Sequence, residues 1–225
     1  MAFDKVVAEE LLKKGLKEIG IICSDDQISA FMTFQSELKK WNRAYNLTAL
    51  RSDKDIVEKH FLDSLLYAIA VPDGTLRLAD AGTGAGFPGI PLKIAIPQLD
   101  VTLIEPSRKK TAFLRHIIRM LGLSEINVIE RRIENLGKEH EKKYDIIVSR
   151  ATFNIEEFLK IACRYTKNDG RLILNKGPKV SGELEELGKH PRLSGQVKKI
   201  HRLYLPFSGA ERNLIVLSCA GTSED

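Results

Sequence analysis

The chain has 225 residues, of which 43% are hydrophobic and 29% are charged, as in globular proteins that bury one full core. Its longest apolar run, at 65–71, is far shorter than the roughly 20 residues that a membrane span requires, and its N-terminal segment mixes acids with lysines instead of forming an apolar signal core. We therefore expect a soluble protein of the cytoplasm. The net charge of +5 is compatible with a polyanionic partner and equally with solvated helix faces.

The first seventy residues are predicted to be helical, because apolar residues recur there at helical spacing. Ser24 is followed by Gln27, and Ser52 is followed by Asp55, the pattern of residues that cap the start of a helix. We expect residues 1–73 to form a helical cap.

After residue 74, short apolar runs alternate with amphipathic segments, which predicts a mainly parallel sheet with helices on both faces. The last two predicted strands lack a helix-length connection, so we expect a hairpin there and one antiparallel strand near the C-terminus. The fold class is therefore α/β, with one domain over 74–225 that joins the cap in a compact unit. Strands are predicted at 75–82, 100–106, 126–131, 144–151, 170–177, 196–206 and 211–220, and helices at 88–96, 107–122, 154–166 and 181–188.

The three cysteines, Cys23, Cys163 and Cys219, are far apart in the chain and odd in number. No Cys-x-x-Cys pair or Cys/His cluster is present, so the sequence predicts free buried thiols and no metal site.

The stretch LADAGTGAGFPGIP (78–91) follows the first predicted strand of the α/β domain. Gly82, Gly84 and Gly86 allow positive φ and have no Cβ to block a ligand. Because the stretch lies where a parallel strand hands over to its helix, it is placed at the edge of the sheet where ligands bind. Pro88 suits the first turn of the following helix.

Three interpretations of this stretch are open. A dinucleotide fingerprint fits only the frame 84–89, which puts Phe87 and Pro88 where backbone N–H groups should face a pyrophosphate, and proline has none. A plain structural turn is the second. The third is suggested by Asp80, two residues ahead of the glycines: a carboxylate there balances a cationic ligand end, such as the ammonium and sulfonium of S-adenosylmethionine.

Residues after the next strands add to the third interpretation. Glu105 follows the second strand, where an acid accepts hydrogen bonds from ribose hydroxyls. Ile133 and Glu134 fall where an adenine is held, although for these two residues alone a plain helix start is the favoured explanation. Arg150 ends the fourth strand, either as a ligand contact or in a structural ion pair. Together these residues favour an S-adenosylmethionine-dependent methyltransferase.

Several motifs resemble one known family over nearly the whole chain, the bacterial 16S rRNA guanine-N7 methyltransferases (RsmG, or GidB). The resemblance rests on WNRAYNLTAL (41–50), HFLDSL (60–65), DAGTGAGFPGIPL (80–92), SRKKTAFL (107–114), SRA (149–151), NKG (175–177) and ERNLIVL (211–217).

This resemblance implies a class I methyltransferase fold with an N-terminal helical extension. It also implies methylation of N7 on one guanine in a 16S rRNA stem-loop near the decoding site, with 16S rRNA or the small ribosomal subunit as the partner. The cofactor contacts that it implies are Gly82, Phe87, Ile133, Glu134 and Arg150. The basic residues that it associates with RNA or the active site are Lys109, Lys110, Arg132, Lys176 and Arg212.

No general base is expected, because guanine N7 carries a free lone pair at neutral pH and catalysis then consists of alignment. Two other classes stay open at this point: a small-molecule methyltransferase and an RNA-binding protein without catalysis. We expect a monomer. Candidates for positioning the substrate are Arg150, Lys176 and Arg212.

The cap contains further polar and aromatic residues whose roles the sequence leaves open. Asn46, His60 and Asp63 form either a polar wall of the active site or a hydrogen-bonded brace between cap and sheet, and the brace is slightly favoured. Trp41 and Tyr45 either stack on a base or pack between the cap and the domain.

Overall fold

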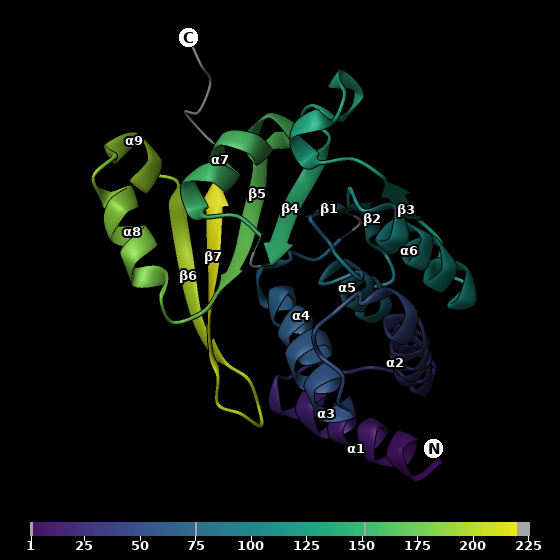
Figure 1. Ribbon diagram of the computed structural model, residues 1–225. Coiled ribbons are helices and arrows are strands. Elements are labelled where there is room, and N and C mark those ends of the chain that lie inside the picture. The colour runs from purple at the N-terminus through teal and green to yellow at the C-terminus, as the bar shows by residue number, and fades with distance from the viewer. Residues whose placement is uncertain (1, 75, 151, 220–225) are drawn as a thin grey trace.

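The computed structural model describes residues 2–74, 76–150 and 152–219 and contains one seven-stranded sheet (Figure 1). The strand order is β3-β2-β1-β4-β5-β7-β6. The strands are β1 (Arg77–Ala81), β2 (Asp100–Ile104), β3 (Ile126–Ile129), β4 (Tyr144–Arg150), β5 (Thr166–Lys176), β6 (Val197–Tyr204) and β7 (Glu211–Ser218). The helices are α1 (Ala2–Glu18), α2 (Asp25–Tyr45), α3 (Asp53–Ile56), α4 (Asp63–Leu65), α5 (Gly89–Ala95), α6 (Arg108–Met120), α7 (Ile155–Ala162), α8 (Val180–Gly188) and α9 (Pro191–Ser194).

Strands β1 to β5 pair in parallel, whereas β7 runs antiparallel to both β5 and β6. The predicted hairpin and the single antiparallel strand are therefore confirmed. Within the described residues, the short helix α9 and a 3₁₀ turn (Lys138–His140) were not predicted.

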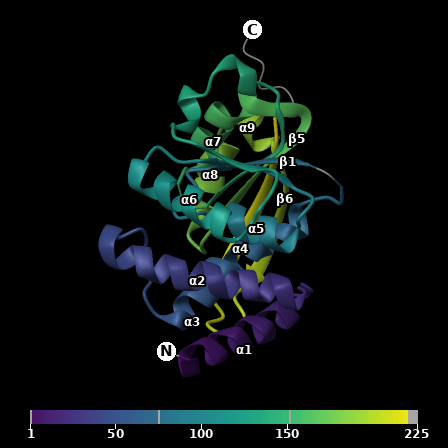
Figure 2. The same cartoon turned by 90° about the vertical axis from the view of Figure 1, so that its right-hand side faces the viewer.

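The central strands are buried on both faces, which explains their unbroken apolar runs. Leu78 and Ile146 face a core shared with the cap and with α5 and α6. Their neighbours Ala79 and Ile147 face a second core formed with α7 and α8. The helices α1 to α3 lie together below the sheet in Figure 2.

Two helices of the cap, α2 and α3, begin at the capping residues predicted from the sequence. The Ser24 side chain accepts a hydrogen bond from the Gln27 N–H, and the Gln27 side chain accepts one from the Ser24 N–H, so both predicted members of the capping box are paired. Ser52 caps α3 by accepting from the N–H of Asp55.

The third predicted helix is helical throughout but is not a regular α-helix. It divides into α3, a π-helical stretch (Val57–Leu62), α4 and a 3₁₀ stretch (Leu66–Ala70). The π-helical stretch turns two polar side chains, Glu58 and His60, into the interior, where they are 1% and 7% exposed. Such stretches occur frequently at functional sites.

The hairpin of β6 and β7 holds the cap against the sheet, and its loop extends down to the cap helices in both views (Figures 1 and 2). Buried Glu58 accepts hydrogen bonds from the N–H groups of Phe207 and Ser208 in this loop. Tyr67 donates to the Ser149 carbonyl at the end of β4, at 2.6 Å.

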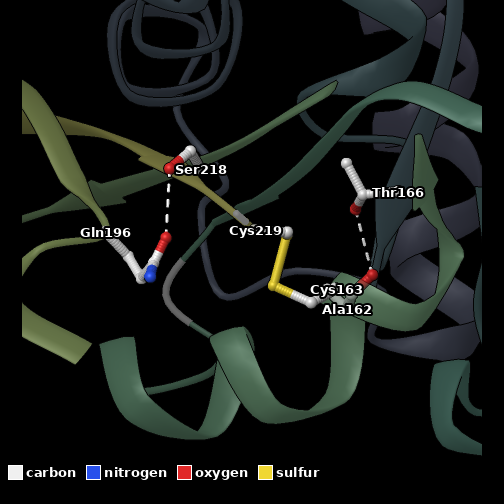
Figure 3. Close-up of a disulfide and its surroundings, with 6 residues drawn as sticks. All are labelled: Ala162, Cys163, Thr166, Gln196, Ser218 and Cys219. Atoms are coloured by element: carbon white, nitrogen blue, oxygen red, sulfur yellow. Dashed lines mark hydrogen bonds between the residues drawn. A yellow bond between two sulfur atoms is a disulfide. The ribbon is translucent and has the colours of Figure 1, made fainter. Parts of the chain in front are cut away.

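The prediction of three free thiols is wrong for two of them. Cys163, directly after α7, and Cys219, directly after β7, form a disulfide (Figure 3). They are 56 residues apart in sequence, but antiparallel β7 brings its carboxyl end back to the start of β5, where α7 also ends. Cysteine spacing cannot reveal this meeting. Cys23 is free.

Candidate active site

The glycine loop (residues 82–86) follows β1 at the carboxyl edge of the parallel strands, as predicted, and the structure shows that this edge faces the cap. Gly82, Gly84 and Gly86 have φ values of 71°, 62° and 100°, a region that favours glycine. A Cβ at Gly86 would lie 2.5 Å from the Ile90 side chain, and one at Gly82 would lie 3.0 Å from Thr152. At Gly84 nothing lies within 4 Å of this position, so the loop is open there.

Asp80 lies beneath the loop and is fully buried. Its Oδ2 accepts from the Thr83 hydroxyl at 2.5 Å and from the Gly89 N–H at 2.7 Å, so the carboxylate braces the loop against α5. Its Oδ1 is buried and has no partner among the residues placed by the structure. Burial raises the pKa of Asp80 to about 6, although the hydrogen bonds from Thr83 and Gly89 oppose the rise.

Glu105 connects the end of β2 to the same loop. Its Oε2 accepts from the Gly84 N–H and its Oε1 from the Ser107 N–H, both at 3.0 Å. The Lys110 ammonium lies 4.0 Å from Oε1. A carboxylate oxygen can accept two hydrogen bonds, and each Glu105 oxygen accepts only one from the backbone. The buried Glu105 carboxylate can therefore also accept hydrogen bonds from hydroxyl groups.

Ile133 and Glu134 lie together in a 3₁₀ turn (Ile133–Asn135) after β3. Ile133 is buried and Glu134 is exposed, so the turn offers one apolar and one polar side chain. Arg132 lies beside them, with Nη1 3.8 Å from Glu134 Oε1.

The Phe87 ring points into the core, 3% exposed, and not onto the open side of the loop. It stacks on the ring of Phe34, at 5.1 Å, and on the imidazole of His60, at 4.2 Å and 7° from parallel. The guanidinium of Arg150 lies over the same ring at 5.2 Å. Phe87 therefore joins the glycine loop to the cap.

Arg150 connects the end of β4 to the π-helical stretch. It donates from Nη1 to the Lys59 carbonyl and from Nη2 to His60 Nδ1, both at 3.0 Å. A guanidinium only donates, so Nδ1 accepts and the ring proton is on Nε2, which donates to the Thr48 hydroxyl at 2.8 Å. Burial, followed by the Arg150 charge, lowers the pKa of His60 to about 3, so the ring is neutral.

Asp63 is the buried acceptor at the centre of this region. Its Oδ1 accepts from Asn175 Nδ2 at 2.8 Å and from Arg212 Nε at 2.9 Å, while its Oδ2 lies 4.0 Å from Arg150 Nη1. One carboxylate thus orients two arginines from different strands. We call this group the cap–sheet network; its members are Thr48, His60, Asp63, Arg150, Asn175 and Arg212.

The hydrogen-bonded brace left open by the sequence is thus present in the structure, with His60 and Asp63 in it. Asn46 contributes through its backbone: it ends α2 in the left-handed conformation, with φ of 49°, so that the chain turns toward His60.

The basic residues singled out from the sequence do not form one cluster. Lys176 follows Asn175 on β5 and so points to the opposite face of the sheet, where it donates to the Phe153 carbonyl at 2.5 Å and pairs with Glu183 at 2.9 Å. Lys109 and Arg132 are exposed, and Lys110 is half-buried beside Glu105. Of the three positioning candidates, only Arg150 and Arg212 share a network.

The family model "GidB: rRNA small subunit methyltransferase G" matches residues 27–215, a span that includes the glycine loop and the whole cap–sheet network. The chain belongs to this family.

Relatives of the rRNA small subunit methyltransferase G family match the chain over almost its full length. A protein of Acetivibrio thermocellus with this name is 38% identical over 92% of the chain and 87% of that protein. One of Desulforamulus reducens is 39% identical over 92% and 88%. A solved S-adenosylmethionine-dependent methyltransferase from Aquifex aeolicus shares the fold, with a TM-score of 0.53, 18% identity and coverage of 81% and 98%. The class I methyltransferase fold is confirmed.

Thr48 and Asn175 are members of the network that residue-level reasoning missed. Both lie inside motifs quoted for the family resemblance: Asn175 directly precedes Lys176, and Thr48 lies two residues after Asn46. In the sequence, each is a short polar residue at the end of a buried segment. Because this pattern is common in proteins, it does not by itself indicate a functional residue.

Two cavities of about 650 and 500 Å³ lie away from the glycine loop; the larger is lined by Arg171, Lys199 and His201 among others, the smaller by Ile21 and Leu203 among others. Among the residues that the structure describes, no cluster of three metal-ligating side chains occurs. A search of the same residues finds no helix long and apolar enough to cross a membrane.

Proposed function

We propose that this protein transfers a methyl group from S-adenosylmethionine to N7 of a guanine in 16S rRNA, within the small ribosomal subunit. Membership of the rRNA small subunit methyltransferase G family carries the assignment of enzyme, cofactor class and rRNA substrate. The choice of atom, the cytoplasmic location and action as a monomer belong to the proposal.

The glycine loop together with Asp80 and Glu105 fits this cofactor, and we call these residues the cofactor cradle. Gly84 leaves the cradle open, Glu105 has lone pairs for ribose hydroxyls, and the buried Oδ1 of Asp80 lacks a donor within the part of the chain described. The turn with Ile133 and Glu134 offers an apolar cover and an acceptor for an adenine. When bound, the cofactor supplies an activated methyl group on a sulfonium.

On the acceptor side, the chain positions arginine donors. Asp63 holds Arg212 through Nε, and the Arg212 Nη2 makes no hydrogen bond to any described residue. Arg150 likewise keeps its Nε free among the residues placed here. N–H groups of this kind suit guanine O6 or a phosphate, and holding N7 in line with the methyl carbon supplies the rate acceleration. The lone pair of N7 makes a general base unnecessary.

The target base must leave its helix, because N7 lies in the deep, narrow major groove of A-form RNA, which side chains do not read. The exposed Lys109 and Arg132 are suited to the RNA backbone. We propose that Lys176 instead serves to dock α8, since its ammonium is committed to Glu183 and the Phe153 carbonyl.

The test uses purified protein, methyl-labelled S-adenosylmethionine and small ribosomal subunits from cells that lack this activity, followed by nucleoside analysis of the RNA. We expect the label in 7-methylguanosine. Cofactor binding without labelled RNA would overturn the rRNA assignment in favour of a small-molecule acceptor. RNA binding without cofactor binding would indicate a protein that lacks catalysis.

A further inference from the structure

The helices α2 and α6 pack antiparallel along a seam that ends at the active-site edge. Glu37 Oε2 pairs with His116 Nε2 at 2.6 Å, and one turn further along α2 the Trp41 ring lies 5.6 Å from the Phe113 ring. The next turn of α2 brings Tyr45 to the seam. On α6, Lys109 precedes Phe113 by four residues and therefore lies on the same face.

Tyr45 packs against a neighbouring ring on α2 and is nevertheless exposed. Its ring lies 5.3 Å from that of Trp41, yet the residue is 46% exposed. Among the aromatic residues whose side chains the structure describes, the other one with comparable exposure is Tyr204 on the edge strand β6, at 55%. Neither the Tyr45 hydroxyl nor the exposed Lys109 ammonium makes a hydrogen bond or ion pair with a described residue.

This end of the seam adjoins both halves of the proposed site. Asn46 turns the chain directly after Tyr45, and Thr48 then binds the ring of His60 in the cap–sheet network. On the other helix, Lys109 lies two residues after Ser107, whose N–H donates to the Glu105 carboxylate in the cofactor cradle.

We infer that Tyr45 and Lys109 form a docking surface for one unpaired base of the RNA substrate. The exposed ring stacks on the base, and the ammonium contacts the adjoining phosphate. A substrate whose target guanine is splayed from its helix exposes neighbouring bases that have lost their own stacking, and every base has a face that an aromatic ring accepts. The inference rests on the proposed rRNA methylation. It adds a contact to an RNA base other than the guanine that is methylated.

The test compares Tyr45→Leu, Tyr45→Phe and the matched control Tyr204→Leu in steady-state methylation of small ribosomal subunits. Leucine keeps the packing against Trp41 but lacks an aromatic face. We expect Tyr45→Leu to raise KM for the RNA roughly tenfold, a typical effect of losing one stacked base. Its kcat and cofactor Kd should stay unchanged, because the ring does not contact the reacting atoms. Tyr45→Phe and Tyr204→Leu should match the wild type.

A second substitution tests the phosphate contact. Lys109→Gln should raise KM and reduce the slope of log KM against log salt by about one, as expected when one phosphate contact is lost. Ultraviolet cross-linking of the wild-type protein to its substrate should recover RNA on the peptide that contains Tyr45, a readout that does not depend on the folding of a variant.

A KM for Tyr45→Leu that matches the wild type, an equal rise in Tyr204→Leu, or cross-links only to other peptides would overturn the docking surface while leaving the methylation assignment intact. A wild-type protein that binds cofactor but does not label rRNA would overturn the proposed function, and this inference with it.

Discussion

The glycine loop and the cap–sheet network lie at the same edge of the sheet but are built differently. The loop is shaped by the backbone: three glycines with positive φ, braced from below by Asp80, all within one short stretch of chain. The network is built from side chains of the cap, of β4, of β5 and of β7. A backbone cradle tolerates little change in residue type, whereas a network of charges fails when one partner is removed.

Arg150→Leu should have the largest effect, because it removes the donors to the Lys59 carbonyl and to His60 Nδ1 and takes a positive charge away from the buried Asp63 carboxylate. We expect the free energy of unfolding to fall by roughly 3 kcal/mol. The pKa of His60, followed by NMR, should rise toward its ordinary value, since the Arg150 charge helps to lower it.

A matched control for Arg150→Leu is Arg77→Leu, at the opposite edge of the sheet. Arg77 makes an exposed pair with Asp100 at 3.7 Å, so its loss should cost at most about 1 kcal/mol. Equal losses in the two variants would contradict a structural role for the network.

Asp80→Asn should change how stability depends on pH. The pKa of Asp80 rises from 3.8 unfolded to about 6 folded, so the folded chain holds a proton that the unfolded chain loses and stability falls as pH rises through this window. The shift corresponds to about 3 kcal/mol. Denaturant titrations across this window should show the variant gaining that much relative to the wild type.

The variant must be compared with the wild type because His60 changes the pH dependence of stability in the opposite direction to Asp80. Its lowered pKa means that the unfolded chain binds a proton the folded chain does not, so stability falls as pH drops below 6.5. Both chains retain His60, so its contribution cancels. A constant difference between the two chains would show that Asp80 is not protonated in the native state.

Gly84→Ala should weaken cofactor binding about tenfold, since a Cβ would project into the open cradle and the left-handed backbone is strained for alanine. Gly122→Ala is the matched control, with φ of 60° against 62° and equally open surroundings, but located after α6. Both variants should lose similar stability in thermal melts, and only the first should lose cofactor affinity by calorimetry. A similar loss of affinity in Gly122→Ala would point to strain instead of the cradle.

Lys176→Met should have the smallest effect. Its ammonium pairs with Glu183 on the far face of β5, so we expect methylation rates and KM for RNA within about threefold of the wild type. A rise in KM well beyond this range would place Lys176 in the RNA interface after all.

The contrast also explains what could be predicted from the sequence. The alternation of strands and helices, the C-terminal hairpin, the capping residues Ser24 and Ser52 and the positive φ of the loop glycines depend on local patterns, and they were predicted correctly. The π-helical stretch at His60 and the bond between Cys163 and Cys219 depend on tertiary packing. Asn175 was missed because sequence spacing does not indicate that β4, β5 and β7 each place a side chain beside the Asp63 carboxylate of the cap.

The glycine loop is proposed to bind the cofactor, and the cap–sheet network to position the RNA. The most direct test of this separation is Asp63→Asn, measured for both cofactor affinity and single-turnover methylation. The asparagine keeps the shape of the side chain but removes the charge that orients Arg150 and Arg212. We expect the cofactor Kd to stay unchanged while the rate at saturating cofactor falls about 100-fold, as small misplacements of a bound substrate cause. A cofactor Kd that weakens as much as the rate falls would contradict the separation of cradle and network.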